Sequence, residues 1–258
     1  MSDKRLDGKV CVVTGSTGGI GEAIAELFSE HGGKIIVSGR NEANGEKVVD
    51  RISSAGNTAQ FIRCDVSDDA QVRALINGTV ERFGGLDVLV NNAATVVGAH
   101  GPGKDVESLL PEVWDSQTRV NLRAVYYLCH LSIPLIRKRG GGTIVNISSV
   151  GGMVVWPKGA AYLASKGALN QLTRSMAVDY IADDIRVNAL CPGWILTPAE
   201  QQRIDADPNI VNPQLEKMGV QRMGTPREMA YAALFLACPE SSYVTGATLL
   251  ADGGWTLQ

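Results

Sequence analysis

The chain has 258 residues and a formal net charge of −3; 45% of its residues are hydrophobic and 20% are charged. This length suits one large α/β domain or two small ones, and it is ample to bury a sizeable core. The charge balance excludes the basic excess typical of proteins that bind nucleic acid or anionic membranes, and no apolar run approaches the ~20 residues that span a bilayer. The charged N-terminus lacks the apolar stretch of a signal peptide, so we expect a cytoplasmic protein.

Short β-branched runs alternate with longer helical patterns along the whole chain. In chain order we expect strand 9–14, helix 20–31, strand 34–38, helix 43–55, strand 60–64, helix 69–83, strand 86–91, helix 111–139, strand 143–148, helix 160–181, strand 186–191, helix 226–237 and strand 248–251. Pro134 should kink or break the longest helix. Strict alternation of short apolar strands with helices predicts a single-domain, doubly wound parallel sheet of the Rossmann type, with helices on both faces. We find no internal repeat or linker and therefore assign residues 1–258 to one domain.

Two long segments interrupt this alternation. Residues 95–104 are rich in glycine and proline and follow the fourth strand, and residues 194–220 follow the sixth. Loops at the carboxyl ends of such strands line the ligand crevice. Long connections there are often functional, so 194–220 is expected to be a substrate lid, with an ordinary surface loop as the alternative.

The five cysteines and three histidines form no ligand pattern. The cysteines are scattered and odd in number, and they include no Cys-x-x-Cys pair. We therefore expect reduced thiols rather than a disulfide framework. The histidines show no His-x-x-x-His spacing, and no metal site is expected.

The first strand runs directly into a glycine-rich loop and then a helix. The loop reads Thr14-Gly15-Ser16-Thr17-Gly18-Gly19-Ile20-Gly21. Glycines let the backbone approach a phosphate, and a helix N-terminus offers free N–H groups and the positive end of its dipole. A glycine loop by itself could be purely structural, but the strand–loop–helix context predicts a dinucleotide pyrophosphate site.

The end of the second strand indicates which dinucleotide binds. A site for NAD commonly places an acidic residue there to bond the ribose 2′-hydroxyl. This chain has Ser38-Gly39-Arg40-Asn41 instead. A guanidinium suits a 2′-phosphate, so the sequence favours NADP, with NAD possible. The alternative is a solvated arginine at a strand end.

Tyr162 and Lys166 lie four residues apart in an Ala-rich helical segment, so they share one helix face. An ammonium beside a phenol favours the phenolate, and we expect it to lower the tyrosine pKa. Such a tyrosine could exchange protons with a carbonyl or an alcohol. Taken alone, the pair could equally be an ordinary amphipathic surface pair.

Taken together, these motifs resemble the short-chain dehydrogenase/reductase family over nearly the whole chain. The resemblance rests on the loop 14–21 and on the following ordered matches: Asp65-Val66, Asn91-Asn92-Ala93-Ala94, Asn121, Ser149 thirteen residues before Tyr162, and Pro192-Gly193 with Ile195 and Thr197. Ala94 stands where the family more often has glycine. The spacing to Tyr162 is the reason for choosing Ser149 over Ser148.

The resemblance implies that Asn121, Ser149, Tyr162 and Lys166 are catalytic. Tyr162 would exchange the proton, Lys166 would lower its pKa and bond the nicotinamide ribose, Ser149 would bond the substrate oxygen, and Asn121 would hold a relay water. It also implies the following cofactor contacts: Gly15, Ser16, Thr17, Gly19, Ile20, Gly21, Arg40, Asp65, Val66, Asn92, Ala93, Ala94, Tyr162, Lys166, Pro192, Gly193, Ile195 and Thr197. Ser148 and Ser149 could instead simply end a strand, and Asn121 could be a buried amide bonded to backbone.

The expected substrate is a neutral ketone or secondary alcohol, because the residues after the fifth strand are small or apolar. The wall should include Val150, Gly151, Gly152, Val154 and Trp156. A 3-oxoacyl-carrier-protein reductase is the first alternative, weakened by Asp183-Asp184 where a carrier-binding relative has basic residues. A non-catalytic NADP-binding regulator is the second. By family analogy we expect a homotetramer that forms through the helices holding Asn121 and Tyr162 and through the segment near 251–254, with neither a nucleic-acid nor a membrane partner.

Overall fold

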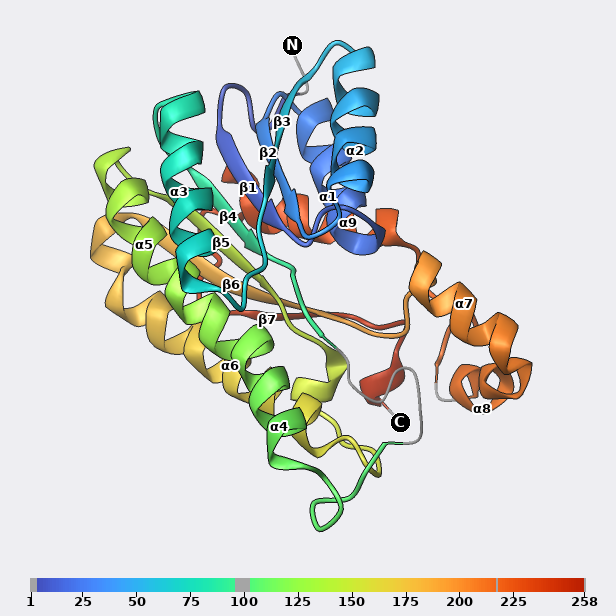
Figure 1. Cartoon of the computed structure of the whole chain (residues 1–258). Coiled ribbons are helices and arrows are strands. Elements are labelled where there is room, and N and C mark those ends of the chain that lie inside the picture. Colours follow the sequence, from blue (N-terminus) through green and yellow to red (C-terminus); the bar gives the residue numbers. More distant parts are fainter. Residues whose placement is uncertain (1–3, 96–102, 217, 258) are drawn as a thin grey trace.

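The computed structural model describes residues 4–95, 103–216 and 218–257 of the chain (Figure 1). Seven strands form one parallel sheet in the order β3-β2-β1-β4-β5-β6-β7. They are β1 (Val10–Thr14), β2 (Lys34–Gly39), β3 (Thr58–Arg63), β4 (Val88–Asn91), β5 (Gly142–Ile147), β6 (Ile185–Pro192) and β7 (Thr248–Ala251). The predicted doubly wound sheet is confirmed, and the strand bounds lie within two residues of those expected.

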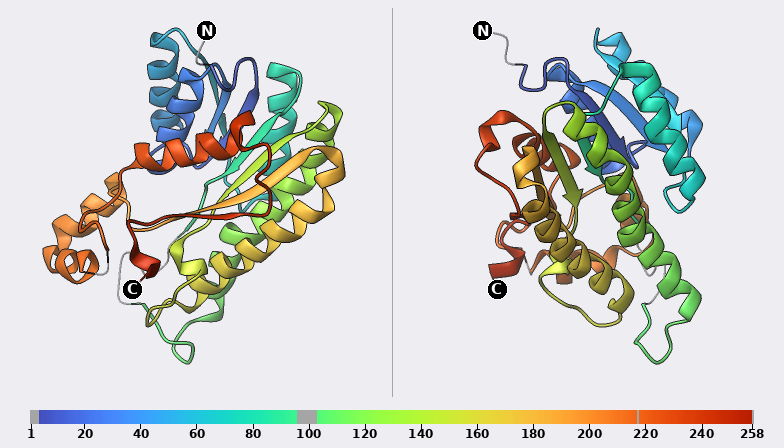
Figure 2. Two further views of the ribbon diagram at one scale, coloured as in Figure 1. Left: turned by 180° about the vertical axis from the view of Figure 1, so that it is seen from behind. Right: turned by 90° about the vertical axis from the view of Figure 1, so that its left-hand side faces the viewer.

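Helices cover both faces of the sheet (Figures 1 and 2). One face packs against α1 (Gly19–Glu30), α2 (Glu42–Ser54) and α9 (Pro226–Ala237). The other packs against α3 (Asp69–Phe83), α5 (Ala124–Lys138) and α6 (Ala160–Asp179). The central strands carry fully buried Val and Ile residues on both sides, as a parallel sheet between two helical layers requires.

The order of the strands reverses direction between β1 and β4. Connections from β1 run outward through β2 to β3, whereas those from β4 run outward through β5 and β6 to β7. Loops leaving β1 and β4 therefore diverge at the carboxyl edge and open a crevice between them, which is where ligands bind in this class of sheet.

The long helix expected at 111–139 is divided near Asn121 rather than at Pro134. The chain forms α4 (Pro111–Thr118), then a π-helical turn over Arg119–Arg123, then α5 with Pro134 inside it. A π-helical turn inserts an extra residue into the helix, and such turns occur frequently at functional sites. Here it carries Asn121 into the interior, where its side chain is 1% exposed.

The segment expected to be a long loop at 194–220 is largely helical. It contains α7 (Pro198–Ala206), a 3₁₀ turn over Pro208–Ile210 and α8 (Val211–Leu215). Thr197 caps α7 because its hydroxyl accepts a hydrogen bond from the Glu200 N–H at 3.2 Å, and Pro198 occupies the first helical position. Of the other predicted loop, 95–104, residues 96–102 lie outside the described part of the chain.

Candidate active site

The glycine loop between β1 and α1 uses backbone conformations that glycine adopts readily. Gly15 and Gly19 have φ angles of +64° and +60°. A Cβ atom on Gly15 would lie 2.8 Å from the Ala93 Cα, and one on Gly21 would lie 2.5 Å from the Gly15 carbonyl oxygen. The loop therefore presents bare backbone at the start of α1, where free N–H groups and the helix dipole favour an anion.

The turn after β4 holds this loop in place. The Asn92 side-chain amide donates to the carbonyl oxygens of Thr14 and Gly15 at 2.9 and 3.0 Å. The Thr14 hydroxyl accepts from the N–H groups of Asn92 and Ala93, both at 3.1 Å, and donates to the Val90 carbonyl. The two crevice-forming loops are thus fixed to each other by a small set of buried hydrogen bonds.

Ser16 occupies a different position from the one predicted for it. Its N–H donates to the Ser38 carbonyl at 2.9 Å, and its hydroxyl donates to the Val13 carbonyl at 2.6 Å and accepts from the Ser38 N–H at 2.9 Å. The residue is fully buried. The structure therefore assigns Ser16 to joining β1 and β2 rather than to contact with a cofactor phosphate.

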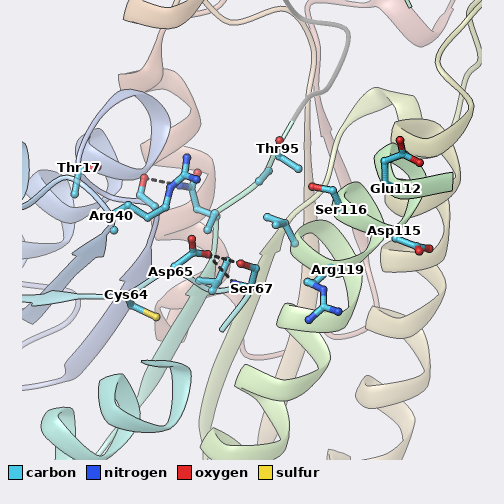
Figure 3. Close-up of a pocket in the computed structure, with 17 residues that line it drawn as sticks. Thr17, Arg40, Cys64, Asp65, Ser67, Thr95, Glu112, Asp115, Ser116 and Arg119 are labelled. Atoms are coloured by element: carbon cyan, nitrogen blue, oxygen red, sulfur yellow. Dashed lines mark hydrogen bonds between the residues drawn. The ribbon is translucent and has the colours of Figure 1, made fainter. Parts of the chain in front are cut away.

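A cavity of about 660 Å³ opens at the carboxyl edge beside the glycine loop (Figure 3). Its size lies within the range of small-molecule sites. Eight predicted cofactor residues line it: Gly15, Thr17, Arg40, Asp65, Val66, Asn92, Ala93 and Ala94. Thr95, from the loop expected to border the crevice, also lines it, whereas the sequence did not predict Gly39, Cys64, Ser67, Glu112, Asp115, Ser116, Arg119 or Val120. Several of these residues belong to α4 and the π-helical turn. These elements meet the glycine loop only in the folded chain, so no local sequence motif predicts the contact.

Arg40 and Asp65 extend from the ends of β2 and β3 into the same end of this cavity (Figure 3). Burial raises the pKa of Asp65, but hydrogen bonds from the Ser67 hydroxyl and N–H, at 2.7 and 2.9 Å, together with the charge of Arg40, outweigh burial and lower it. Asp65 is thus ionised at neutral pH and its orientation is fixed by Ser67. Asp65, which follows β3, therefore places a carboxylate close enough to Arg40 for the two charges to interact.

Ser149, Tyr162 and Lys166 come together beside the ends of β5 and β6. Ser149 caps a 3₁₀ turn over Val150–Gly152 by accepting the Gly151 N–H at 3.0 Å, and its side chain is hydrogen-bonded to that of Tyr162. The Lys166 Nζ atom donates to the Ile147 carbonyl at 2.8 Å and lies 5.8 Å from the centre of the Tyr162 ring. Ser148 instead donates to the Lys166 backbone carbonyl at 3.2 Å.

Burial controls the acidity of the tyrosine–lysine pair. It raises the pKa of Tyr162, although the hydrogen bond with Ser149 acts in the opposite direction. It lowers the pKa of Lys166 to about 8. The Tyr162 pKa is therefore raised rather than lowered as expected, because burial is the largest influence on it and the Lys166 ammonium bonds to the Ile147 carbonyl.

Asn121 connects the π-helical turn to the segment after β4. Its Oδ1 atom accepts from the Thr95 N–H at 2.8 Å, and its Nδ2 atom donates to the Thr95 carbonyl at 2.9 Å and to the Ser165 hydroxyl at 3.2 Å. The Ser165 hydroxyl in turn donates to the Tyr162 carbonyl at 2.7 Å. Asn121 thus braces the turn of α6 that carries Tyr162, and its polar atoms bond mainly to backbone.

The end of β6 and the segment after it hold four further predicted residues, and one of them, Thr197, contacts the glycine loop. Pro192 ends β6, and the Gly193 N–H donates to the Ala251 carbonyl at 3.0 Å. Ile195 is 7% exposed. The Thr197 methyl carbon would lie 3.4 Å from a Cβ on Gly19, so the start of 194–220 contacts the loop directly. Ile20 packs against the core at the same corner.

These features fit a nicotinamide dinucleotide. The glycine cradle provides an anion site that a Cβ atom would fill, the cavity extends from it toward Arg40, and the Ser149–Tyr162–Lys166 cluster lies along the same sheet edge, outside the cavity lining. Among the residues that the structure describes, no three His, Cys, Asp or Glu side chains gather into a possible metal site. In the same part of the chain, no helix is long and apolar enough to cross a membrane.

Comparisons with known proteins agree with this geometry. Residues 15–256 match a family model described as enoyl-(acyl carrier protein) reductase. An NADP-dependent (R)-specific alcohol dehydrogenase of Lentilactobacillus kefiri is 38% identical over 261 residues, covering 100% of both chains. A gluconate 5-dehydrogenase from Burkholderia cenocepacia J2315 in complex with NADP and tartrate is similar in structure, with a TM-score of 0.91 and 33% identity over 100% of this chain and 98% of that one. A 7α-hydroxysteroid dehydrogenase complexed with NADH and 7-oxo glycochenodeoxycholic acid gives a TM-score of 0.92 and 34% identity over 98% and 96%.

The similarity extends over the whole domain, and the named relatives oxidise alcohols or reduce ketones with nicotinamide cofactors. The protein is accordingly an NAD(P)-dependent oxidoreductase that acts on CH–OH and C=O groups, and the chain belongs to the short-chain dehydrogenase/reductase family.

Proposed function

We propose that this protein transfers hydride between NADP and a ketone or secondary alcohol, with Tyr162 exchanging the proton. The observation that carries the proposal is the Ser149–Tyr162–Lys166 cluster, with Ser149 and Lys166 buried and Tyr162 half-buried, at the sheet edge that also holds the glycine cradle. A nicotinamide bound along this edge would supply or accept the hydride, and its oxidised form would add a positive charge.

Each residue of the cluster has a distinct role in the proposal. The Tyr162 hydroxyl gives its proton to the carbonyl oxygen during reduction and takes it back from the alcohol during oxidation. Ser149, held by the Gly151 N–H, donates a hydrogen bond to the same oxygen and stabilises the developing charge. Lys166 bonds the nicotinamide ribose and helps hold the phenol in place. Asn121 positions α6 through Ser165 and holds the relay water.

The phenol of the free protein suits carbonyl reduction. Because burial raises the Tyr162 pKa, the hydroxyl stays protonated at neutral pH and is available as a donor. Oxidation requires the phenolate, which a positively charged nicotinamide would favour.

Tyr162→Phe tests the catalytic assignment. The variant should lose about 10²- to 10⁴-fold in turnover, because the ring remains while the exchangeable proton is lost. Reduction of a ketone panel with NADPH, followed by cofactor absorbance, measures this loss, and fluorescence titration should show nearly unchanged NADPH binding. Near-wild-type turnover in the variant would overturn the assignment.

The preference for NADP rests on Arg40. It directly follows β2 and lines the cavity beside Thr17 and Gly39, and neither β2 nor the pair Arg40-Asn41 contains an acidic residue. A guanidinium there would pair with the 2′-phosphate. Arg40→Ala should weaken NADP binding at least about tenfold and leave NAD binding nearly unchanged. Higher kcat/KM with NAD in the wild-type protein would contradict the preference.

The two alternative functions make different predictions. A 3-oxoacyl-carrier-protein reductase would need a basic surface for an acidic carrier, but Arg137 is paired with Asp183 at 2.6 Å next to α6. An NADP-binding regulator would bind the cofactor and turn over no carbonyl. The ketone panel, with a carrier-linked 3-oxoacyl substrate included, separates all three functions.

We further propose a homotetramer and a lid at 194–220. Exposed apolar side chains on α5, α6 and α9 support the assembly: Tyr126 is 52% exposed, Val178 75%, Tyr231 53% and Phe235 39%. Light scattering that gave a monomer would refute the tetramer.

The contact between Thr197 and the glycine loop supports the lid, because ordering of residues 194–220 would then depend on the cofactor. Limited proteolysis within α7, with and without NADPH, tests that coupling.

A further inference from the structure

Three aromatic rings lie in a row that begins at Tyr162. The centre of the Trp156 ring is 6.2 Å from that of Tyr162, and the centre of the Trp255 ring is 6.1 Å from that of Trp156, with the two indoles inclined by only 28°. Trp156 follows the 3₁₀ turn after β5, and Trp255 begins the last 3₁₀ turn of the chain, Trp255–Leu257. Both segments lie at the carboxyl edge of the sheet (Figure 2).

The position of Trp156 is set by glycines. A Cβ atom on Gly151 would lie 2.7 Å from the indole Cη2 atom, and one on Gly159 would lie 2.8 Å from Nε1. The same two Cβ atoms would meet the Leu163 side chain at 2.9 and 3.0 Å. The indole therefore packs against backbone that only glycine can provide here, with Leu163 beside it, which limits its freedom to turn.

The turn that carries Trp255 is fastened to the rest of the site by Asp252. Its carboxylate accepts from the Thr256 N–H and hydroxyl at 2.9 and 2.8 Å and from the Gly254 N–H at 3.0 Å. The Asp252 Cα would lie 2.7 Å from a Cβ on Gly193, in the turn after β6. The Gly253 carbonyl accepts the Val220 N–H at 3.1 Å, at the end of the expected lid.

The two chain segments that carry the indoles contain few charged side chains. Between residues 150 and 165 the sequence has one charged side chain, the exposed Lys158, and between 253 and 257 it has none. Met153 and Val155, on either side of Val154, are 56% and 85% exposed. Apolar side chains left exposed next to a reactive phenol are typical of a binding wall rather than of a solvent-facing loop.

We propose that Trp156 and Trp255 form the specificity wall of the substrate site beside Tyr162 and select an uncharged substrate with a ring next to the reacting carbon. The inference rests on the proposed function, because it takes the Tyr162 hydroxyl as the point where the substrate oxygen binds. A ring attached to the carbonyl carbon then extends along Trp156 toward Trp255. An indole face stacks favourably on a flat or cyclic apolar group, and a short acyclic ketone is too small to cover it.

The test compares two ketones, α-tetralone and butan-2-one, with NADPH. Wild-type protein should have at least about tenfold higher kcat/KM for α-tetralone. Trp156→Ala and Trp255→Ala should each reduce this preference about tenfold, mainly through KM. Trp156→Phe and Trp255→Phe should recover most of it, which a misfolded variant could not do. Trp114→Ala, an exposed tryptophan on α4, is the matched control and should leave the preference unchanged.

Equal losses on both ketones, or a wild-type preference for butan-2-one, would overturn the inference while leaving the proposed reaction intact. Quenching of tryptophan fluorescence by α-tetralone provides a readout independent of turnover. Quenching that disappears in Trp156→Ala, together with no turnover of either ketone, would support the wall and refute the proposed reaction. Absence of both quenching and α-tetralone turnover would refute the wall.

Discussion

Replacing Lys166 with methionine should change how the stability of the cofactor-free protein depends on pH. Burial lowers the pKa of Lys166 from 10.5 to about 8. At about 1.4 kcal/mol per pKa unit, this difference is worth about 3 kcal/mol between the two protonation states. Because the pKa is lower in the folded protein than in the unfolded chain, the wild type bears this penalty in full below pH 8. The penalty is relieved as the pH rises from 8 to 10.5.

The methionine variant should therefore gain stability relative to the wild type at pH 7. The gain is reduced by about 1 kcal/mol for the lost hydrogen bond to the Ile147 carbonyl. The difference between the two proteins should then change by about 3 kcal/mol between pH 8 and pH 10.5, in favour of the wild type.

Urea unfolding of both proteins at pH 7, 8, 9 and 10 measures this difference, and other groups that titrate in alkali cancel in the comparison. Lys47→Met, at an exposed position on α2, is the matched control and should follow the wild type at every pH. Parallel curves for the wild type and Lys166→Met would refute the reasoning, because they would mean that Lys166 is solvated in the folded protein.

Gly21→Ala should weaken NADPH binding and lower the melting temperature, because the new Cβ would lie 2.5 Å from the Gly15 carbonyl oxygen; Gly18→Ala, whose nearest contact would be 3.9 Å away, should do neither. Asp87→Ala should lower the free energy of unfolding, measured in urea, by about 2 kcal/mol, because it leaves the buried Val10 N–H without its acceptor and removes the ion-pair partner of Arg139. Ketone reduction should fall as the pH rises through the elevated Tyr162 pKa, because the acid form donates the proton; activity that fell below pH 7 instead would contradict this.

Local sequence patterns were sufficient for the sheet and for most of the cofactor edge. Short β-branched runs between helical segments predict the strands because a two-sided parallel sheet buries nearly every residue of its central strands. The glycine spacing predicts the loop because steric limits on φ act within a few residues. The helices within 194–220 were not predicted although Thr197 and Pro198 carry a capping signal, because the length of the segment favoured a loop.

Properties that depend on distant packing could not be read from the sequence. The tyrosine pKa depends on how completely the surrounding elements exclude water. The position of Ser16 in the glycine loop predicts a phosphate contact, whereas its hydrogen bonds join it to β2. The cavity lining supplied by α4 and the packing of Trp255 against Trp156 come from segments that meet only in the folded chain. A break in a helix is also expected first at proline, whereas here the irregularity lies at Asn121 and α5 continues through Pro134.

The π-helical turn has a consequence for how the enzyme can vary. One extra residue in a helix advances everything after it by about 100° around the axis. Leu128, Cys129 and Ile136 pack into the core only because α5 starts with that rotation. Deleting one residue to restore a regular helix would turn Asn121 away from Thr95 or turn this apolar stripe toward solvent. The rotation of α5 about its axis and the position of the Asn121 side chain therefore depend on each other. A change in the length of this helix alters both.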